Sequence, residues 1–588
     1  MEPIQVDFTG GGDNTKGRGK SAYLMPEKSG LKLIISIIGT VIGGAIAYYF
    51  MLPPLNFKST DTYMFIGVVA AIFIGLLFVT SGAFLKPEYT EYVKKRSLPA
   101  IAVIAILAVV VGVGFAVSSV VFRAKTYSNI IAVNEETSFA SDIEEADFSA
   151  VPVLDNAAAG VLANRTLGDL ASIGAISQFE VSGQMTQINY KNEPVKVTTL
   201  AYGDVFKWLK NTKEGLPGYV VVNMVTQKAE LKLLPEGQYI KYSVNEHFGK
   251  YLMRHVRFAY PTYIFDMPHF EIDEAGKPYW LCPVLDKTIG LFGGTDVKGV
   301  VIVDAVTGEM TEYTAEEVKT SKELQWIDGI YSESLLLEQF NYYGQYKNGF
   351  INSLLGQDGV KMATEGANFL AQNDDVYLYT GVTSAGNDQA IIGFVLVNMR
   401  TKDASFYAVS GAKERSAQSS AQGEVQDYAY AATFPILLNI SGEPTYFMSL
   451  KDKDNLVKRY AMVNVENYQV VVTGTTIAEC TDAYVKKLKQ NNINIDVDID
   501  KIEDITGTPE TETPEVATKK VKGAITDIRT AVMGGESVYF IELDDKGVYY
   551  SIEASDNAMV VILNKGETIT VTVDADAEGD IIEAISVK

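Results

Sequence analysis

Three uncharged apolar runs near the start of the chain constrain its fold more than any other feature. They cover residues 33–52, 63–85 and 98–122. Each has about 20 residues or more, which is enough for a helix to cross a hydrocarbon core of roughly 30 Å. Ion and proton pathways usually need ionisable side chains inside the membrane, and these runs contain none. The pattern predicts a three-helix membrane anchor, and Gly39 and Gly43 permit the first helix to contact a neighbour closely.

Basic residues beside the runs predict the orientation of this anchor, residues 31–125, because cytoplasmic flanks retain positive charge. With a cytoplasmic N-terminus, nine basic residues lie on the cytoplasmic side: Lys16, Arg18, Lys20, Lys28, Lys32, Lys86, Lys94, Lys95 and Arg96. The opposite orientation places three there: Lys58, Arg123 and Lys125. We therefore expect a multi-pass plasma-membrane protein with a disordered cytoplasmic tail, residues 1–30. Everything after the third run is then extracellular.

Charge separates the two parts of the chain. Residues 1–126 carry a net charge of +5, and residues 127–588 carry −28. A portion this acidic is repelled by phosphate backbones, which argues against nucleic acid as a partner. The two cysteines, Cys282 and Cys480, are too few for a disulfide scaffold. They form a single bridge or stay as two buried thiols.

The outer portion divides into segments of different composition. Residues 126–175 read as a polar, acidic spacer followed by a helix over residues 153–170. Residues 176–500 show a recurring α+β pattern. Residues 501–520 are rich in Thr, Glu and Pro, which predicts a linker too polar to form a core. Residues 521–588 return to strand-like runs.

The recurring pattern is a Gly, four apolar residues, an Asn or Asp, two further residues and a Thr. It occurs at residues 218–226, 299–307 and 393–401, and a weaker copy occupies residues 460–467. This pattern predicts a buried strand that enters a tight hairpin, where the Asn or Asp side chain bonds the backbone two residues on and Gly308 adopts a positive φ. An earlier strand is expected in each unit, at residues 194–200, 278–284, 376–382 and 445–450.

Helical segments are expected between the units. They cover residues 245–256, 334–355 and 475–489. The second places four apolar residues near one face: Leu336, Phe340, Tyr343 and Phe350. Such a face either packs in the core or binds a partner.

The hairpin of the second unit resembles the end of a PepSY-type domain. A strand reaching the sequence VDAVTGEM, residues 303–310, precedes a helix there. The first and third copies have Asn223 and Gln227, or Asn398 and Lys402, in place of the Asp and Gly. PepSY-like modules occur in envelope proteins, some associated with secreted peptidases, so the resemblance implies binding or regulation rather than catalysis.

The end of the chain resembles a small OB-type barrel. Its five strand-like runs cover residues 521–532, 537–543, 548–553, 568–573 and 581–587, with a short segment at 557–563. OB barrels often bind single-stranded nucleic acid through basic grooves and stacked rings. Four aromatic residues offer such rings: Tyr539, Phe540, Tyr549 and Tyr550. However, residues 521–588 hold 5 basic and 13 acidic groups, a net charge of −8 that opposes this function.

Partial catalytic motifs are present but incomplete. Residues 10–21 end like a phosphate-binding loop, but Asn14 stands where a Gly is required, and a basic tail beside lipid headgroups is the alternative. Ser410 and Lys413 have the spacing of a lysine-activated serine without its companion motifs. The histidines lack the spacing of metal ligands on a helix: His247, His255 and His269. Three acids lack the spacing of a calcium loop: Asp266, Glu271 and Asp273.

We therefore expect no catalytic, cofactor-binding or metal-binding residues. The leading hypothesis is a non-enzymatic, extracellular binding or scaffold protein of the cell envelope, held in the lipid bilayer of a single-membrane bacterium. Its expected partner is another envelope protein or an exported enzyme, and its oligomeric state stays open. One alternative is a PepSY-like regulator of a secreted peptidase or other exported hydrolase. Another is an enzyme of unrecognised type, for which the three acids named above are the nearest candidates.

Overall fold

The computed structural model describes residues 24–148, 150–175, 177–372, 374–385, 390–491, 493, 518–533, 536–553, 557–574, 579 and 581–587. The chain forms two compact units, Met1–Thr506 and Gly507–Lys588. The phosphate-loop-like residues 10–21, the tail as far as residue 23 and the linker as far as residue 517 lie outside the described residues.

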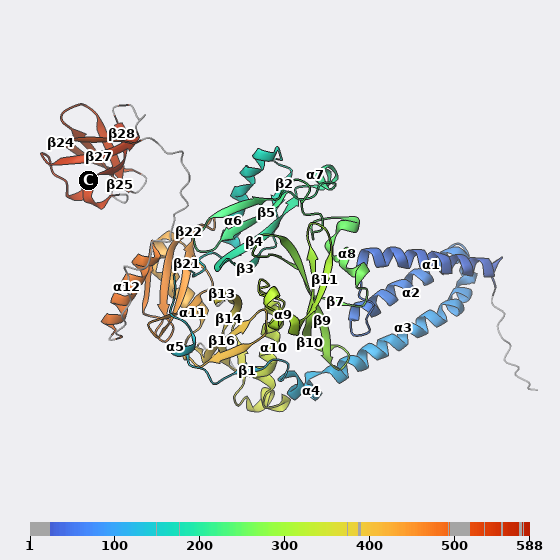
Figure 1. The fold of residues 1–588 in the computed structure, drawn as a ribbon. Helices are drawn as coiled ribbons and strands as arrows, with labels where there is room; N and C mark the ends of the chain where they lie inside the picture. The colour runs from blue at the N-terminus through green and yellow to red at the C-terminus, as the bar shows by residue number, and fades with distance from the viewer. Residues whose placement is uncertain are drawn as a thin grey trace, which may run out of the picture. The chain divides into compact units, whose positions relative to one another are not determined.

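The anchor contains three helices long and apolar enough to cross a membrane (Figure 1). They are α1 (Ser29–Met51), α2 (Thr60–Ser81) and α3 (Thr90–Ser118). The expected third span was wrong at its end, because α3 stops at Ser118 and does not reach residue 122. A new helix, α4 (Val120–Tyr127), begins there, and the hydroxyl of Ser119 caps it by accepting the N–H of Val121.

The first two helices contact each other closely through glycine. A Cβ atom on Gly39 would lie 2.9 Å from Cδ1 of Leu76, and one on Gly43 would lie 3.0 Å from Cγ2 of Ile72. Both distances are shorter than side chains normally allow, so the pair is tight because these residues lack a side chain. The expected close contact of the first helix is confirmed.

Four sheets in the region after the anchor share one order of connections. In each, two short strands pair in turn with a long third strand, the third pairs with a fourth, and the fourth pairs with a fifth. The first unit contains β2 (Phe179–Val181), β3 (Thr186–Tyr190), β4 (Glu193–Tyr202), β5 (Gly218–Asn223) and β6 (Ala229–Leu233). The second contains β7 (Ile264–Phe265), β8 (His269–Ile272), β9 (Pro278–Ile289), β10 (Gly293–Asp304) and β11 (Met310–Thr314).

The other two units follow the same order. The third contains β12 (Lys361–Ala363), β13 (Asn368–Gln372), β14 (Asp375–Ser384), β16 (Gly393–Asn398) and β17 (Ala404–Tyr407). The fourth contains β19 (Ala431–Ala432), β20 (Ile436–Ile440), β21 (Glu443–Lys451), β22 (Val457–Asn464) and β23 (Val471–Gly474). The third and fourth strands of every unit lie where the sequence pattern predicts strands. We call these four units, with the segments that connect them, the body.

The predicted turn chemistry is confirmed at the end of the fourth strand. The Oδ1 atoms of Asn223, Asp304 and Asn398 each accept the backbone N–H groups of the residues two and three positions on. Gly308 has a φ of 78°, as expected. Gln227 and Lys402, which replace that glycine in the first and third units, take the same left-handed conformation, with φ values of 58° and 64°.

The segment between the anchor and the first unit is part of the body rather than a separate spacer. Its strand β1 (Val133–Asn134) extends the third sheet by pairing in parallel with β17. Further along, the N–H of Ala146 donates to the carbonyl of Asn439 in β20 at 2.9 Å. The polar composition of this segment does not predict its packing, because the segment pairs with the edges of sheets through backbone groups.

The described helices of the body are α5 (Phe139–Asp142), α6 (Asn156–Arg165), α7 (Val205–Asn211), α8 (Leu252–Ala259), α9 (Ala315–Thr320), α10 (Glu333–Tyr346), α11 (Glu414–Glu424) and α12 (Ile477–Gln490). Four of them overlap the expected helical segments: α6, α8, α10 and α12. The expected start at residue 245 was wrong, because a turn and a short 3-10 helix, Phe248–Lys250, precede α8. The expected helix over 334–355 also stops early, and Gly349 beyond it has a φ of 89° that no α-helix contains.

The apolar face of α10 is a core stripe. Leu336 and Phe340 are fully buried, and Tyr343 is 8% exposed. These residues contact the strands of the second and third sheets in one apolar cluster. The alternative of an exposed aromatic face for a partner is therefore not supported here.

The C-terminal unit is a closed five-stranded barrel in the order β24-β25-β26-β28-β27. Its strands are β24 (Thr518–Met533), β25 (Glu536–Leu543), β26 (Tyr549–Glu553), β27 (Thr568–Asp574) and β28 (Ile581–Val587). Residues 518–520, expected in the linker, begin β24. Tyr550 is buried inside the barrel, and the hydroxyl of Tyr549 donates to Asp527 at 3.0 Å.

Candidate functional site

The membrane anchor and the body meet at a joint of direct hydrogen bonds and an ion pair. In the loop between α1 and α2, the N–H of Leu55 donates to the carbonyl of Pro261 at 2.7 Å. Lys58 in the same loop forms an ion pair with Asp286 of β9 at 2.8 Å. The loop between the first two spans is therefore bound to the second unit and its neighbour α8.

Two arginines of α8 complete this side of the joint. Arg254 donates from Nε to the carbonyl of Tyr49 at 3.1 Å, and Arg257 donates from Nε to the carbonyl of Leu52 at 3.0 Å. Carbonyls at the end of a helix lack partners within the helix and carry partial negative charge, so cations there are favourable. The arginines therefore bind the end of α1 as capping groups.

The third span is held by the tip of the β9–β10 hairpin. The hydroxyl of Ser118 accepts the N–H groups of Leu291 and Phe292 at 2.9 and 3.0 Å. The ring of Phe292 lies 4.8 Å from that of Phe115, and a Cβ atom on Gly114 would lie 2.6 Å from it. The spans thus connect to the second unit and to α8 on one side of the anchor.

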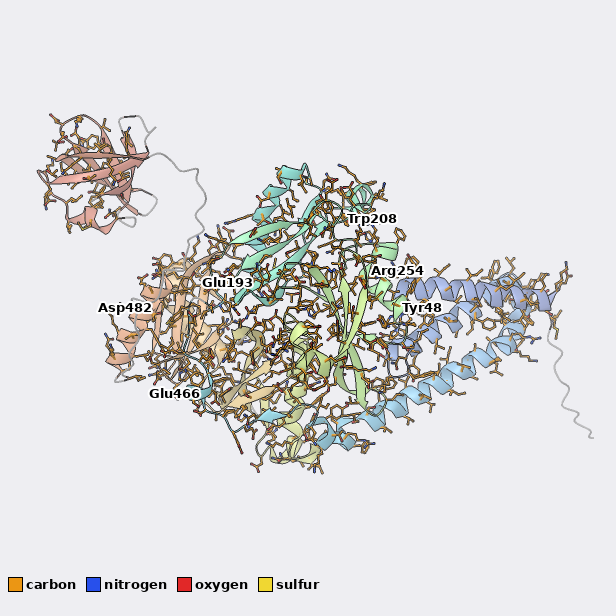
Figure 2. All side chains as sticks on the ribbon, viewed as in Figure 1. Tyr48, Glu193, Trp208, Arg254, Glu466 and Asp482 are labelled. Atoms are coloured by element: carbon orange, nitrogen blue, oxygen red, sulfur yellow. The ribbon has the colours of Figure 1, made fainter. Side chains whose placement is uncertain are left out.

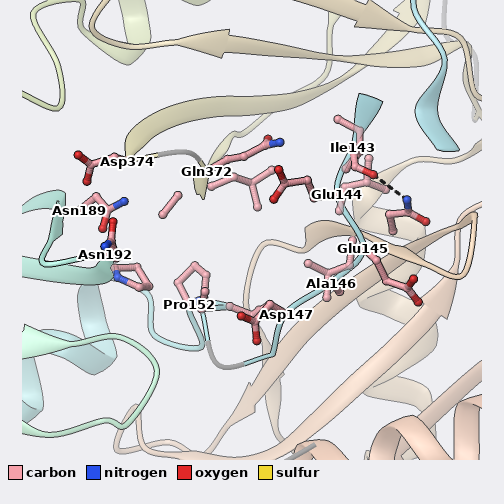
Figure 3. Close-up of a pocket in the computed structure, with 18 residues that line it drawn as sticks. Ile143, Glu144, Glu145, Ala146, Asp147, Pro152, Asn189, Asn192, Gln372 and Asp374 are labelled. Carbon is pink, nitrogen blue, oxygen red and sulfur yellow. Dashed lines mark hydrogen bonds between the residues drawn. The ribbon is translucent and has the colours of Figure 1, made fainter. Parts of the chain in front are cut away.

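A hollow of about 270 Å³ lies where the first, third and fourth units approach the segment 143–152 (Figure 3). Its polar lining consists of carboxylates and amides, including Glu144, Glu145, Asp147, Asn189, Gln372 and Asp374. Asn439 fixes one wall by donating from Nδ2 to the carbonyl of Ile143 at 2.7 Å. The described lining residues include no Ser, Cys, His or Lys, and the carboxylates and amides that line the hollow can receive a small polar or cationic group.

The acidic trio expected as the nearest enzyme candidate has structural roles. Asp273 accepts the N–H groups of Ala275 and Lys277 in the β8–β9 turn, at 3.0 and 2.8 Å. Asp266 accepts the hydroxyl of Ser332 at 2.8 Å. Glu271 lies buried in β8 and accepts the backbone N–H of Asp328 at 3.1 Å. The described residues contain no cluster of His, Cys, Asp or Glu that could hold a metal ion.

The other candidates from the sequence also lie apart. His247 contacts the ring of Trp208 edge-on, and the Nε2 of His255 lies 2.8 Å from the carbonyl of Gly308. Ser410 is exposed, and within the described residues no hydrogen bond joins it to Lys413. Cys282 and Cys480 are both buried and free, so they do not form the disulfide bond that the sequence left open.

Sequence reasoning missed a buried acidic cluster at the base of the second unit. Asp328 is 3% exposed; its Oδ2 accepts the N–H of Asn189 at 3.0 Å, and its own N–H donates to Glu271 at 3.1 Å. Among the described residues, the Oδ1 atoms of Asp328 and Asn189 are buried acceptors without a hydrogen-bond donor. Burial and the nearby Glu271 raise the pKa of Asp328. The sequence feature that could have revealed this cluster is a single acid, Asp328, within the apolar run 327–330.

A second group that was missed is a buried lysine. Lys196 in β4 is 5% exposed and lines a cavity of about 180 Å³ together with Asp155 and Glu333. Burial lowers the pKa of its ammonium group to about 8, and Asp155 opposes that shift. Its contact with Oε1 of Gln187 is long, at 3.5 Å. A basic residue in the apolar run of a predicted buried strand was the sequence signal.

Comparison with known proteins finds no family that matches the chain and no curated protein with a significant match. The functional conclusion therefore rests on the anchor, the joint and the body.

Proposed function

We propose that the chain is a membrane-anchored, non-enzymatic binding or scaffold protein whose body faces the outside of the cell. The observation that carries this proposal is the joint. The spans are bound to the second unit and to α8, so the body keeps a fixed position over the membrane. A scaffold needs this property, because a body on a free tether does not hold its partner at a defined place.

The repeated architecture supports a binding role. The four sheets share one connection order, so we propose that they are copies of one unit that resembles a PepSY-type module. Neighbouring copies bury their apolar faces against one another in continuous clusters. Such an array presents several similar edges and the acidic hollow, which fit a partner with basic or polar groups.

We also propose that the C-terminal barrel belongs to the OB class. Its strand order and the parallel pairing of β26 with β28 support this assignment. The barrel surface does not suit nucleic acid, because two of its few cations, Arg529 and Lys565, are engaged by Asp527 at 2.8 and 2.6 Å. We expect a protein partner instead.

Chemical cross-linking on intact cells with a membrane-impermeant reagent tests the scaffold proposal. The full-length chain should recover a specific envelope protein, and a chain that ends before residue 507 shows whether the barrel or the body binds it. Cross-links of the body that appear only after permeabilisation, and then to cytosolic proteins, would reject the proposal.

A second candidate function is regulation of an exported hydrolase. It is favoured by the PepSY-like hairpin of the second unit, where β10, a tight turn and β11 lead into α9 as the resemblance implies. A secreted peptidase should then co-purify with the chain, and its activity should fall in proportion to added full-length protein. Unchanged activity of a co-purified peptidase would leave the scaffold as the function.

A further inference from the structure

A groove of about 920 Å³ opens beside the body-side end of α1. Its walls come from the last turn of α1, from α7 and from the segment before α8, and include Tyr49, Phe50, Trp208, Leu209, Phe248 and Arg254. Figure 2 shows Arg254 near the end of α1 that carries Tyr48, with Trp208 beyond it. Tyr49 and Phe50 belong to the final turn of a span, so the groove begins at the level where the bilayer ends.

The walls of this groove are fixed before any ligand binds. Glu246 is 2% exposed, and its carboxylate accepts the Nε1–H of Trp208 at 2.8 Å, the hydroxyl of Thr212 at 3.2 Å and the hydroxyl of Tyr202. The guanidinium of Arg254 lies 4.0 Å from the centre of the Tyr49 ring. These contacts hold the aromatic wall in one orientation and join it to α1, which reduces the ordering cost of binding.

The mouth of the groove is lined and flanked by large apolar side chains that no part of the body covers. Phe206 is 81% exposed, and four others are more than half exposed: Phe50, Val205, Leu209 and Phe248. Contiguous exposed apolar side chains in a soluble region mark a binding surface or a membrane contact. Lys207 and Lys210 on the same short helix suit the headgroup layer, because lysine places its stem in apolar surroundings and its charge in water.

We propose that this groove takes one acyl chain of a membrane lipid from the leaflet on the side of the body. The bilayer is the source of apolar chains at this height, and α1 leads directly from it into the groove. No carboxylate in the described part of the chain forms an ion pair with Arg254, so its charge favours the phosphate of the same lipid. The bound lipid would stabilise the joint between anchor and body. The inference holds for either orientation of the anchor, so it does not depend on the proposed function.

Fluorescence quenching in nanodiscs tests this proposal on the full-length chain. The nanodiscs contain phosphatidylcholine with or without bromine on its acyl chains, and bromine quenches tryptophan only at short range. The chain has three tryptophans: Trp208, Trp280 and Trp326. We expect brominated lipid to quench a component of the emission that the Trp208→Phe variant lacks. Equal quenching of both proteins would overturn the proposal.

Two variants distinguish a chain inside the groove from a bilayer that merely touches its mouth. Ala201→Phe fills the groove, because Ala201 lines it and is 8% exposed. Leu209→Gln makes the exposed wall polar and is a mild change on a helix surface. Both should lose the Trp208-dependent quenching, whereas Leu355→Gln, at an exposed leucine outside the groove, should keep it. Quenching that persists in a folded Leu209→Gln protein would contradict the proposal, even if Ala201→Phe does not fold.

Discussion

At the residue scale, one side-chain contact in each unit joins the end of the fourth strand to the start of the third. We call this contact the tie. In three units the tie is an amide donating to a carboxylate: Asn223 to Glu193 at 2.7 Å, Asn398 to Asp375 at 2.8 Å and Asn464 to Glu443 at 3.3 Å. In the second unit the polarity is reversed, and Asp304 pairs with Lys277 at 2.7 Å. Where the turn residue is the acid Asp304, its partner is the base Lys277. The two residues therefore change together, which indicates that each unit requires this contact.

A reciprocal exchange in the second unit tests this complementarity. Lys277→Glu alone should destabilise the body by about 1 kcal/mol, because it places two carboxylates together. Asp304→Asn should restore stability in the double variant, since an amide then donates to Glu as in the other units. Urea unfolding of the four proteins gives the coupling energy; additive effects would show that the tie is incidental.

Lys196 makes stability depend on pH. Its pKa in the folded chain is about 8, whereas a lysine in an unfolded chain titrates near its ordinary value of roughly 10.4. Between these values the unfolded chain holds a proton that the fold has lost, so stability rises with pH in that window. Below pH 8 the fold bears the full cost of a buried ammonium group, about 3 kcal/mol for a shift of this size.

The variant Lys196→Met should therefore be more stable than the parent at pH 7, and its advantage should shrink by pH 10. Unfolding midpoints in urea at the two pH values measure this difference. The matched variant Lys453→Met, at an exposed lysine, should show no such change. An advantage of Lys196→Met that does not vary with pH would mean that packing, rather than the buried charge, is responsible.

At the scale of strands and helices, the glycine that begins the sequence pattern in three of the fourth strands is a steric requirement. A Cβ atom at Gly218, Gly299 or Gly393 would lie 2.2 Å from a carbonyl oxygen of the fifth strand. No side chain fits at that distance, so the two strands would have to separate. This explains why the sequence pattern begins with Gly.

Gly299→Ala should lower the free energy of unfolding by about 2 kcal/mol or more. The control is Gly423→Ala in α11, where nothing lies within 4 Å of an added Cβ and alanine is the better helix former. Thermal unfolding compares the two. Equal midpoints for both variants would contradict the close approach of the strands.

The joint between anchor and hairpin can be weakened at one atom. Ser118→Ala removes the acceptor of two backbone N–H groups, at Leu291 and Phe292, and should speed their hydrogen exchange. The neighbouring variant Ser119→Ala affects the cap of α4 and should leave these two amides unchanged. Identical exchange in both variants would show that the hairpin does not depend on the third span.

Local patterns predicted the strands well, because a run of apolar residues ending in Asn or Asp depends only on neighbouring residues. They failed where distant segments decide the outcome. The start of α8 depends on a turn and on the contacts of Arg254 with α1. Lys196 and Asp328 are unusual only because the fold buries them. The groove joins three segments that are far apart in the sequence, so no single pattern could have revealed it.

At the scale of the whole molecule, the joint fixes which loop between the apolar helices lies next to the body. The loop containing Lys58 is on the body side, and its charge is paired with Asp286. The opposite loop carries Lys86, and the start of α3 beside it carries Lys94, Lys95 and Arg96. The described positive charge therefore concentrates on the side away from the body, which favours an extracellular body under the positive-inside rule.

Cysteine labelling on intact cells tests this orientation most directly. Burial raises the thiol pKa of Cys480 to about 12 and raises that of Cys282 further, so the native thiols give little background with a membrane-impermeant maleimide. Asp454→Cys reports on the exposed surface of the body, and Glu88→Cys reports on the loop at the other side of the anchor. The account predicts labelling of Asp454→Cys in intact cells and of Glu88→Cys only after permeabilisation. Labelling of Glu88→Cys alone in intact cells would contradict it.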